Sequence, residues 1–139
     1  MTELRRYLRE NRHLTGPGVY MLEVQFFQDE TRSTYYKVGG TKHLIRRLHQ
    51  YGTAYMPMMH HVRVVGVFPF TDKPVFEVEA AIHSWLRAYT HQTNPLRSRT
   101  RSRTRSRTRS GSRSKLEWYA IRPQQLRKVL ARLAVMTLG

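Results

Sequence analysis

Hydrophobic and polar positions near the start of the chain follow patterns typical of a helix and a β-hairpin. Leucine and tyrosine recur every three to four residues over 2–13, which predicts a short basic helix. Residues 19–27 and 34–38 are rich in β-branched and aromatic side chains, and the polar segment between them is typical of a turn. The two segments are therefore predicted to pair as antiparallel strands.

The pattern changes after the hairpin, where a turn signal precedes a basic segment. Gly39 and Gly40 are expected to end the second strand. Thr41 is then expected to cap a helix that continues to about Tyr51. The valine-rich segment 61–70 predicts a third strand.

The last third of the chain predicts two more helices with one strand between them. Pro74 suits the first turn of a helix that Thr71 or Asp72 would cap. Residues 116–121 have β composition, and Pro123 opens a final helix with an apolar stripe. This order of elements predicts an α/β (α+β) fold with a mainly antiparallel, three-stranded sheet flanked by helices. The predicted division is an N-terminal helix at 1–15, a domain at 16–93 and 116–139, and a disordered Arg/Ser/Thr-rich insert at 94–115.

The insert is a low-complexity tract in which arginine alternates with Ser or Thr from Arg97 to Arg109. A segment without apolar groups and with self-repelling charges is predicted to be disordered. It is either an electrostatic tether to phosphates or a repeat expansion that a surface loop tolerates at little cost in stability. Its composition resembles the tails of splicing-factor SR proteins, which implies phosphorylation by an SR-type kinase at Ser98, Ser102, Ser106 and Ser110.

Charge and composition narrow the class of partner. Twenty-five Lys and Arg against nine Asp and Glu give a net charge of +16. Nine of the basic residues lie in 97–115, so the rest of the chain keeps sixteen basic and nine acidic residues, or +7. A polyanion is therefore the expected partner. Nucleic acid is favoured over a membrane because the longest basic stretch has no apolar face.

Other classes are excluded by what the sequence lacks. It has no cysteine, so disulfides, cysteine-type zinc sites and thiol catalysis are excluded. It has no apolar run of membrane-spanning length, and its polar N-terminus does not resemble a secretory signal. We expect an intracellular, soluble protein, nuclear or nucleic-acid-associated in a eukaryotic or viral setting.

Five short motifs carry a resemblance to a known family. They are "GPGVYML" at 16–22, "YYKVGGT" at 35–41, "RRLHQY" at 46–51, "VEAAIH" at 78–83 and "EWY" at 117–119. In this order they resemble the GIY-YIG nuclease superfamily. They are most similar to its phage and viral branch, which is described as a DNA-binding domain. In that branch the second signature reads Lys-Ile-Gly and a late motif reads Glu-Trp-Phe.

The resemblance implies roles for particular residues. Tyr20, Lys37, Arg47 and Glu79 match the positions that form the catalytic site, and Glu79 matches the glutamate that holds a single divalent ion, Mg²⁺ or Mn²⁺. An arginine can grip a phosphate with two hydrogen bonds, and one carboxylate with substrate phosphates is a common way to hold Mg²⁺. The residues predicted to contact nucleic acid are Lys37, Lys42, Arg47, Tyr51, His83, Arg97, Arg99, Arg101, Arg103 and Arg105.

The chain departs from the nucleases at Lys37, where they carry a tyrosine. A lysine binds phosphate but is normally protonated at neutral pH, which makes it a poor general base. Tyr36 is adjacent, yet successive strand residues point to opposite faces, so it is no automatic substitute. Structural alternatives also remain open: Tyr20 as a half-buried sheet residue, and Glu79 with His83 as a surface pair one helical turn apart.

Three functional hypotheses follow from these observations. The first is a nucleic-acid-binding protein, with DNA expected and RNA as the alternative, that binds mainly through phosphates. The second is a metal-dependent endonuclease. The third is a nuclear interaction module with a phosphorylated Arg/Ser tail. The sequence predicts neither base specificity nor oligomeric state.

Overall fold

The computed structural model describes residues 3–28, 31–51, 59–92 and 118–138, so the predicted insert at 94–115 lies outside the described residues. The elements in chain order are α1 (Glu3–Glu10), β1 (Gly18–Gln28), β2 (Thr31–Thr41), α2 (Leu44–Tyr51), β3 (Met59–Pro69), α3 (Val75–Tyr89), β4 (His91–Gln92), β5 (Trp118–Ala120) and α4 (Pro123–Leu138). The predicted α+β class is confirmed. None of the helices in the described part of the chain is long and apolar enough to cross a membrane.

One sheet organises the fold, with strand order β3-β1-β2-β5-β4. Each of its strand pairs is antiparallel. Its three long strands, β3, β1 and β2, are those predicted from the sequence. The expectation of a three-stranded sheet is nevertheless too small, because β5 pairs with the free edge of β2 and β4 then pairs with β5.

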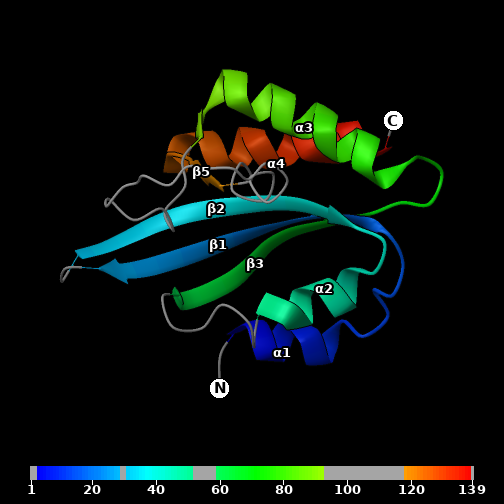
Figure 1. Cartoon of the computed structure of the whole chain (residues 1–139), viewed down its shortest axis with the longest axis horizontal. Helices are drawn as coiled ribbons and strands as arrows, with labels where there is room; N and C mark the ends of the chain where they lie inside the picture. The colour runs from blue at the N-terminus through cyan, green and yellow to red at the C-terminus, as the bar shows by residue number, and fades with distance from the viewer. Residues whose placement is uncertain (1–2, 29–30, 52–58, 93–117, 139) are drawn as a thin grey trace, which may run out of the picture.

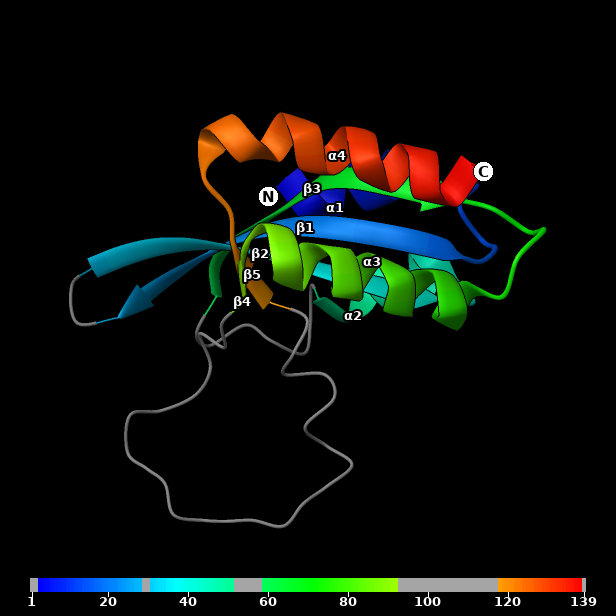
Figure 2. The same ribbon diagram turned by 90° about the horizontal axis from the view of Figure 1, so that it is seen from above.

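Helices cover both faces of this sheet (Figure 1). Helices α1 and α2 lie on one face, while α3 and α4 lie side by side on the other (Figures 1 and 2). Residues 19–22 of strand β1 are buried on both faces of the sheet, which explains the unbroken apolar run there. Its Tyr20, Leu22 and Val24 pack in the core under α1 and α2, and its Val19 and Met21 pack in the core under α3 and α4.

Three local predictions are wrong. The two glycines do not end β2, which continues through Thr41. Thr41 does not cap α2 either: its Oγ1 accepts a hydrogen bond from the His43 amide at 3.1 Å, and the helix begins at Leu44. The cap predicted at 71–72 is replaced by Pro74, which is extended and provides no side-chain hydrogen bond. In each case the end of the strand or the start of the helix lies one to three residues later than the local signal indicates.

Strand β3, which pairs with β1 on the side away from β2, contains a β-bulge. Val64 and Gly66 of β3 pair with consecutive residues of β1, so Val65 between them is an extra residue. The bulge changes which face the following residues occupy. Val67 therefore packs with Val64 in the core under α1 and α2, whereas Val65 packs in the core under α3 and α4.

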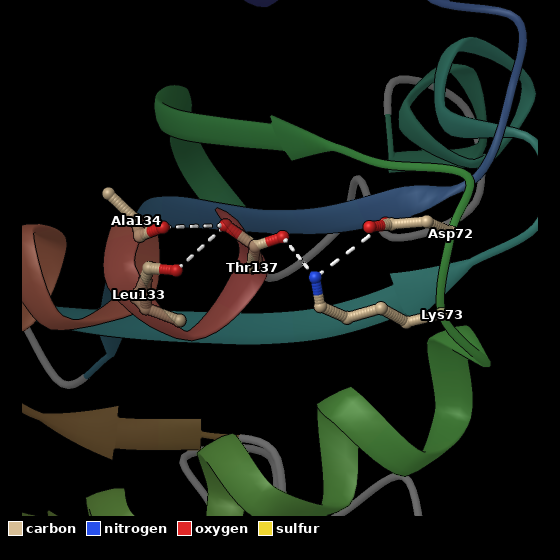
Figure 3. Close-up of polar contacts among 5 residues, drawn as sticks. All are labelled: Asp72, Lys73, Leu133, Ala134 and Thr137. Atoms are coloured by element: carbon tan, nitrogen blue, oxygen red, sulfur yellow. Dashed lines mark hydrogen bonds and ion pairs between the residues drawn. The ribbon is translucent and has the colours of Figure 1, made fainter. Parts of the chain in front are cut away.

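The C-terminal helix is tied to the segment that precedes α3 (Figure 3). Lys73 Nζ donates a hydrogen bond to the backbone oxygen of Thr137 at 3.1 Å and lies 3.6 Å from the Asp72 carboxylate. The Thr137 hydroxyl donates within the helix to the backbone oxygens of Leu133 and Ala134. A cation at the carbonyl end of a helix is favourable, so Lys73 stabilises the end of α4.

Candidate nucleic-acid and metal site

Tyr20, Arg47 and Tyr51 form a hydrogen-bonded cluster between β1 and α2. The two tyrosine hydroxyls lie 2.8 Å apart, and their rings meet edge to face with centroids 5.8 Å apart. Arg47 Nε donates to the Tyr20 hydroxyl at 3.3 Å, and its guanidinium carbon lies 5.8 Å from the Tyr51 ring centroid. A third contact comes from Gln50, whose Oε1 accepts from Arg47 Nη1 at 2.9 Å.

Local sequence explains how this cluster forms. Arg47 and Tyr51 are four residues apart on α2, so they lie on the same face of the helix. Both tyrosines are almost completely buried, while Arg47 is half-buried. Their rings anchor the helix to the sheet, and their hydroxyls form a polar group at the edge of the core that Arg47 can bond. Arg47 is therefore held in one orientation at the surface.

Gly39 makes room for the cluster. It pairs with Tyr20 across the two central strands, and a Cβ added at Gly39 would meet the Tyr20 hydroxyl and come within 2.7 Å of its Cζ. Any side chain at this position would therefore collide with the ring. The glycine is needed here for close approach of the tyrosine and not for a turn.

Lys37 lies on the same face of β2, two residues before Gly39, but it is buried. Only 4% of it is exposed, and its Nζ lies 5.1 Å from the centroid of the Trp118 ring. Trp118 is also its partner in the β2–β5 pairing. This distance permits a cation–π interaction, which partly compensates a buried ammonium for the water it loses.

Tyr36 points to the opposite face of the sheet, as the alternation of strand residues predicts. Its hydroxyl donates to Glu23 Oε2 at 2.9 Å, and Glu23 also forms a salt bridge with Arg63 at 3.1 Å. Burial, together with the hydrogen bond to the Glu23 carboxylate, raises the pKa of Tyr36 to about 12. Tyr36 is therefore neither placed nor ionised to replace the tyrosine expected at Lys37.

Glu79 belongs to a second polar cluster, which approaches β2 from the α3 side. Its Oε2 lies 3.5 Å from His83 Nε2, one turn along the same helix. His83 Nδ1 forms a hydrogen bond with the Tyr119 hydroxyl, and the two rings stack with their centroids 5.6 Å apart. A Cβ added at Gly40 would lie 3.2 Å from the Glu79 Cβ and 3.3 Å from its Oε1, so the carboxylate lies close against the strand.

Comparison with protein families identifies the family of the chain. Residues 18–134 match the T5orf172 domain. The chain belongs to the T5orf172 domain family. This is a phage-associated domain in the context of endonucleases, which supports a role related to nucleic acid. Comparisons with curated proteins and with solved structures gave no match.

The T5orf172 domain distributes the predicted site residues over two clusters. Tyr20, Arg47 and Tyr51 meet on the α2 side, and Glu79 approaches the next residue of β2 from the α3 side. Lys42 is exposed just before α2. Burial leaves Lys37, Tyr51 and His83 little surface for direct contact with nucleic acid. The predicted arginines at 97, 99, 101, 103 and 105 lie outside the described residues.

Sequence reasoning missed three members of the two clusters in this T5orf172 domain. Gln50 has a signal, since it lies three residues after Arg47 on one helix. Gly40 has a weaker signal, because a glycine inside a strand indicates close approach by another group. The contact between Tyr119 and His83 has none, because it joins residues of α3 and β5 that are far apart in the sequence.

The second cluster sets a limit on metal binding. No group of three or more His, Asp or Glu side chains gathers among the described residues. A closed structural site of the zinc-finger type is therefore not formed by this part of the chain. A single carboxylate still fits a divalent ion when substrate phosphates and water supply the other ligands, as is common for Mg²⁺.

Proposed function

We propose that this T5orf172 domain binds nucleic acid mainly through phosphates, and that the nucleic acid is DNA. The proposed site has a GIY-YIG-like arrangement. The observation that carries the proposal is the half-buried Arg47 guanidinium, held by Tyr20, Gln50 and Tyr51. The net charge of +16 adds a general attraction for polyanions. Exposed Lys42 lies next to the same helix and adds to the positive field.

Arg47 is suited to phosphate because its position is fixed before binding. A free arginine side chain loses rotamer entropy when it is immobilised at an interface, and preorganisation reduces that cost. Arg47 already has its Nε on a buried hydroxyl and its Nη1 on Gln50. A planar guanidinium held in this way matches the geometry of phosphate oxygens. Arg46, its exposed neighbour, carries the same charge but is not part of the cluster.

The test compares Arg47→Ala with Arg46→Ala, which remove the same charge from adjacent positions of one helix. Affinity for two DNA duplexes of unrelated sequence is measured by fluorescence anisotropy in EDTA at several salt concentrations. Hydrogen bonds to charged groups are worth about 1.5–3 kcal/mol, so Arg47→Ala should weaken binding roughly 10- to 100-fold. The loss should be similar for both duplexes, because phosphate contacts carry no sequence information.

Arg46→Ala should cost less than about threefold, as expected for a screened surface charge. Arg46→Ala should unfold at the wild-type urea concentration, and Arg47→Ala should lose about 1 kcal/mol with its hydrogen bond to Tyr20, so both variants are fully folded in the binding assay. Equal losses in the two variants would contradict the proposal and indicate a diffuse basic face. Binding that differs between the two duplexes only in wild type would instead indicate base readout by Arg47.

A metal-dependent endonuclease is the second candidate, and the placement of Glu79 favours it. Glu79 lies against Gly40 of β2, the residue after the Gly39 that Tyr20 packs against, and there it would hold one Mg²⁺ or Mn²⁺ ion with phosphate oxygens from the substrate. Against hydrolysis, Lys37 is buried against Trp118 and Tyr36 is turned to Glu23. We therefore propose slow or absent cleavage. The third hypothesis, a phosphorylated tail, concerns the tract outside the described residues and stays a prediction.

A further inference from the structure

His83 has an unusual environment for a surface helix. Only 8% of the residue is exposed, and its Nε2 is buried without a hydrogen-bond partner among the described residues. That nitrogen faces Glu79 Oε2 at 3.5 Å, which is longer than a normal hydrogen bond. A buried polar atom without a partner costs about 1–3 kcal/mol. The structure therefore contains a nitrogen and a carboxylate oxygen that face each other but do not bond directly.

We propose that Glu79 and His83 together bind one first-row transition-metal ion, such as Co²⁺ or Zn²⁺, in preference to Mg²⁺. The inference deepens the proposed function, because it assigns the metal class and a second ligand at the same site. Glu79 supplies Oε2 and His83 supplies Nε2. Tyr119 is a positioning residue that holds the imidazole.

Distance and helix geometry support a shared ion. Protein nitrogen and oxygen ligands lie about 2.0–2.2 Å from such metals, so two ligands of one ion can be at most about 4.3 Å apart. The observed 3.5 Å fits within that limit. The two residues are four apart on α3, which places their side chains on one face of the helix without any rearrangement of the backbone.

The contact between His83 and Tyr119 is of the kind that metal-binding histidines make. Such histidines use the second ring nitrogen to bond an outer partner, which fixes the ring and its tautomer. Here Nδ1 bonds the Tyr119 hydroxyl, and the rings stack. With the proton on Nδ1, Nε2 presents a lone pair toward Glu79. Gly40 allows the carboxylate to stay against β2 while it faces that lone pair.

The donor atoms determine the class of metal. Magnesium takes oxygen ligands and keeps several waters, whereas imidazole nitrogen suits Zn²⁺ and the later first-row metals, and affinity rises from Mn²⁺ to Co²⁺. Two protein ligands leave several coordination positions for water or a phosphate oxygen. Open positions are typical of metal sites that act on a bound substrate. The proposed ion would therefore connect the Glu79–His83 pair to nucleic acid.

The test is isothermal titration of the untagged full chain with Co²⁺, Zn²⁺ or Mg²⁺ chloride in the absence of nucleic acid. One Co²⁺ and one Zn²⁺ should bind per chain, at least tenfold more tightly than Mg²⁺. Glu79→Gln and His83→Gln should each weaken Co²⁺ binding tenfold or more. Tyr119→Phe should weaken it about tenfold, the lower end of outer-partner effects. His49→Gln, a matched change at an exposed histidine on α2, should leave it unchanged.

Several results would overturn the inference. One is no Co²⁺ binding at millimolar concentration, and another is equal affinity for Co²⁺ and Mg²⁺ with loss only in Glu79→Gln. A loss in His49→Gln as large as in His83→Gln would also contradict it. If His83→Gln does not fold, Glu79→Gln and Tyr119→Phe decide, since both keep the shape of the side chain. Duplex affinity in EDTA depends on Arg47 and not on the ion, so failure of this inference and failure of nucleic-acid binding are distinguishable.

Discussion

Replacing Gly39 by alanine tests whether the Tyr20–Arg47–Tyr51 cluster is held as tightly as the structure shows. The new Cβ would meet the Tyr20 hydroxyl and lie 2.7 Å from Cζ and 3.2 Å from Cε2. The ring has little freedom to move away, because it is fully buried and its hydroxyl bonds Tyr51 at 2.8 Å. Either the ring or the strand must therefore shift.

The expected cost follows from three contributions. Overpacking of a well-packed core costs about 1–3 kcal/mol. Disturbing a hydrogen bond of the Tyr20 hydroxyl costs roughly a further 1 kcal/mol. Replacing glycine also lowers the entropy of the unfolded chain, which offsets about 0.4–1 kcal/mol. We expect Gly39→Ala to lower the free energy of unfolding by about 1–3 kcal/mol.

Urea unfolding followed by circular dichroism measures this loss, with Gly16→Ala as the matched control. A Cβ at Gly16 meets nothing within 4 Å, so that change should be neutral or slightly stabilising. In a Tyr20→Phe background the nearest atom is absent, and the cost of Gly39→Ala should fall by about 1 kcal/mol. The reasoning is refuted if Gly39→Ala behaves like Gly16→Ala, or if its cost is the same in both backgrounds.

Two further predictions concern groups outside the site. Lys73→Met should lower the free energy of unfolding by about 1 kcal/mol, because the Lys73 ammonium bonds a carbonyl at the negative end of α4, whereas Lys128→Met at an exposed position of that helix should not. Equal losses in urea unfolding would contradict this role. The pKa of Tyr36 is raised from 10.0 to about 12, so the stability this gives is present below pH 10 and is lost as pH rises to 12. Over that window wild type should lose more stability than Tyr36→Phe, and parallel pH profiles of the unfolding midpoint would contradict it.

The order of elements could be predicted because hydrophobic patterning reports it directly. Alternation marked the hairpin, and helical spacing marked the helices that cover it. The sheet is larger than predicted for two reasons: no local signal shows that β5 pairs with β2, and β4 has only two residues, His91 and Gln92, which are too few for any pattern. The bulge at Val65 is likewise invisible in a run of valines, since each of them suits either face of a buried sheet.

The candidate site was predictable in part, and the limit is physical. Tyr20 and Arg47 were expected together and do meet. Lys37 was predicted to contact nucleic acid because the resemblance places it in the site, yet it is buried. Its burial depends on Trp118, which reaches β2 only after the chain has passed through α3 and the insert. Local sequence contains no information about such a long-range partner.

The two glycines of β2 show how a local signal can be recognised correctly and interpreted wrongly. Gly39 and Gly40 were interpreted as the end of a strand, because glycine usually interrupts one. In the structure they stay within β2, and each admits a side chain from one side: Tyr20 on the α2 side and Glu79 on the α3 side. A side chain at either position would push one cluster away from the strand. The pair therefore explains how residues from α2 and α3, on opposite faces of the sheet, come against the same end of β2, where the proposed phosphate and metal contacts would act together.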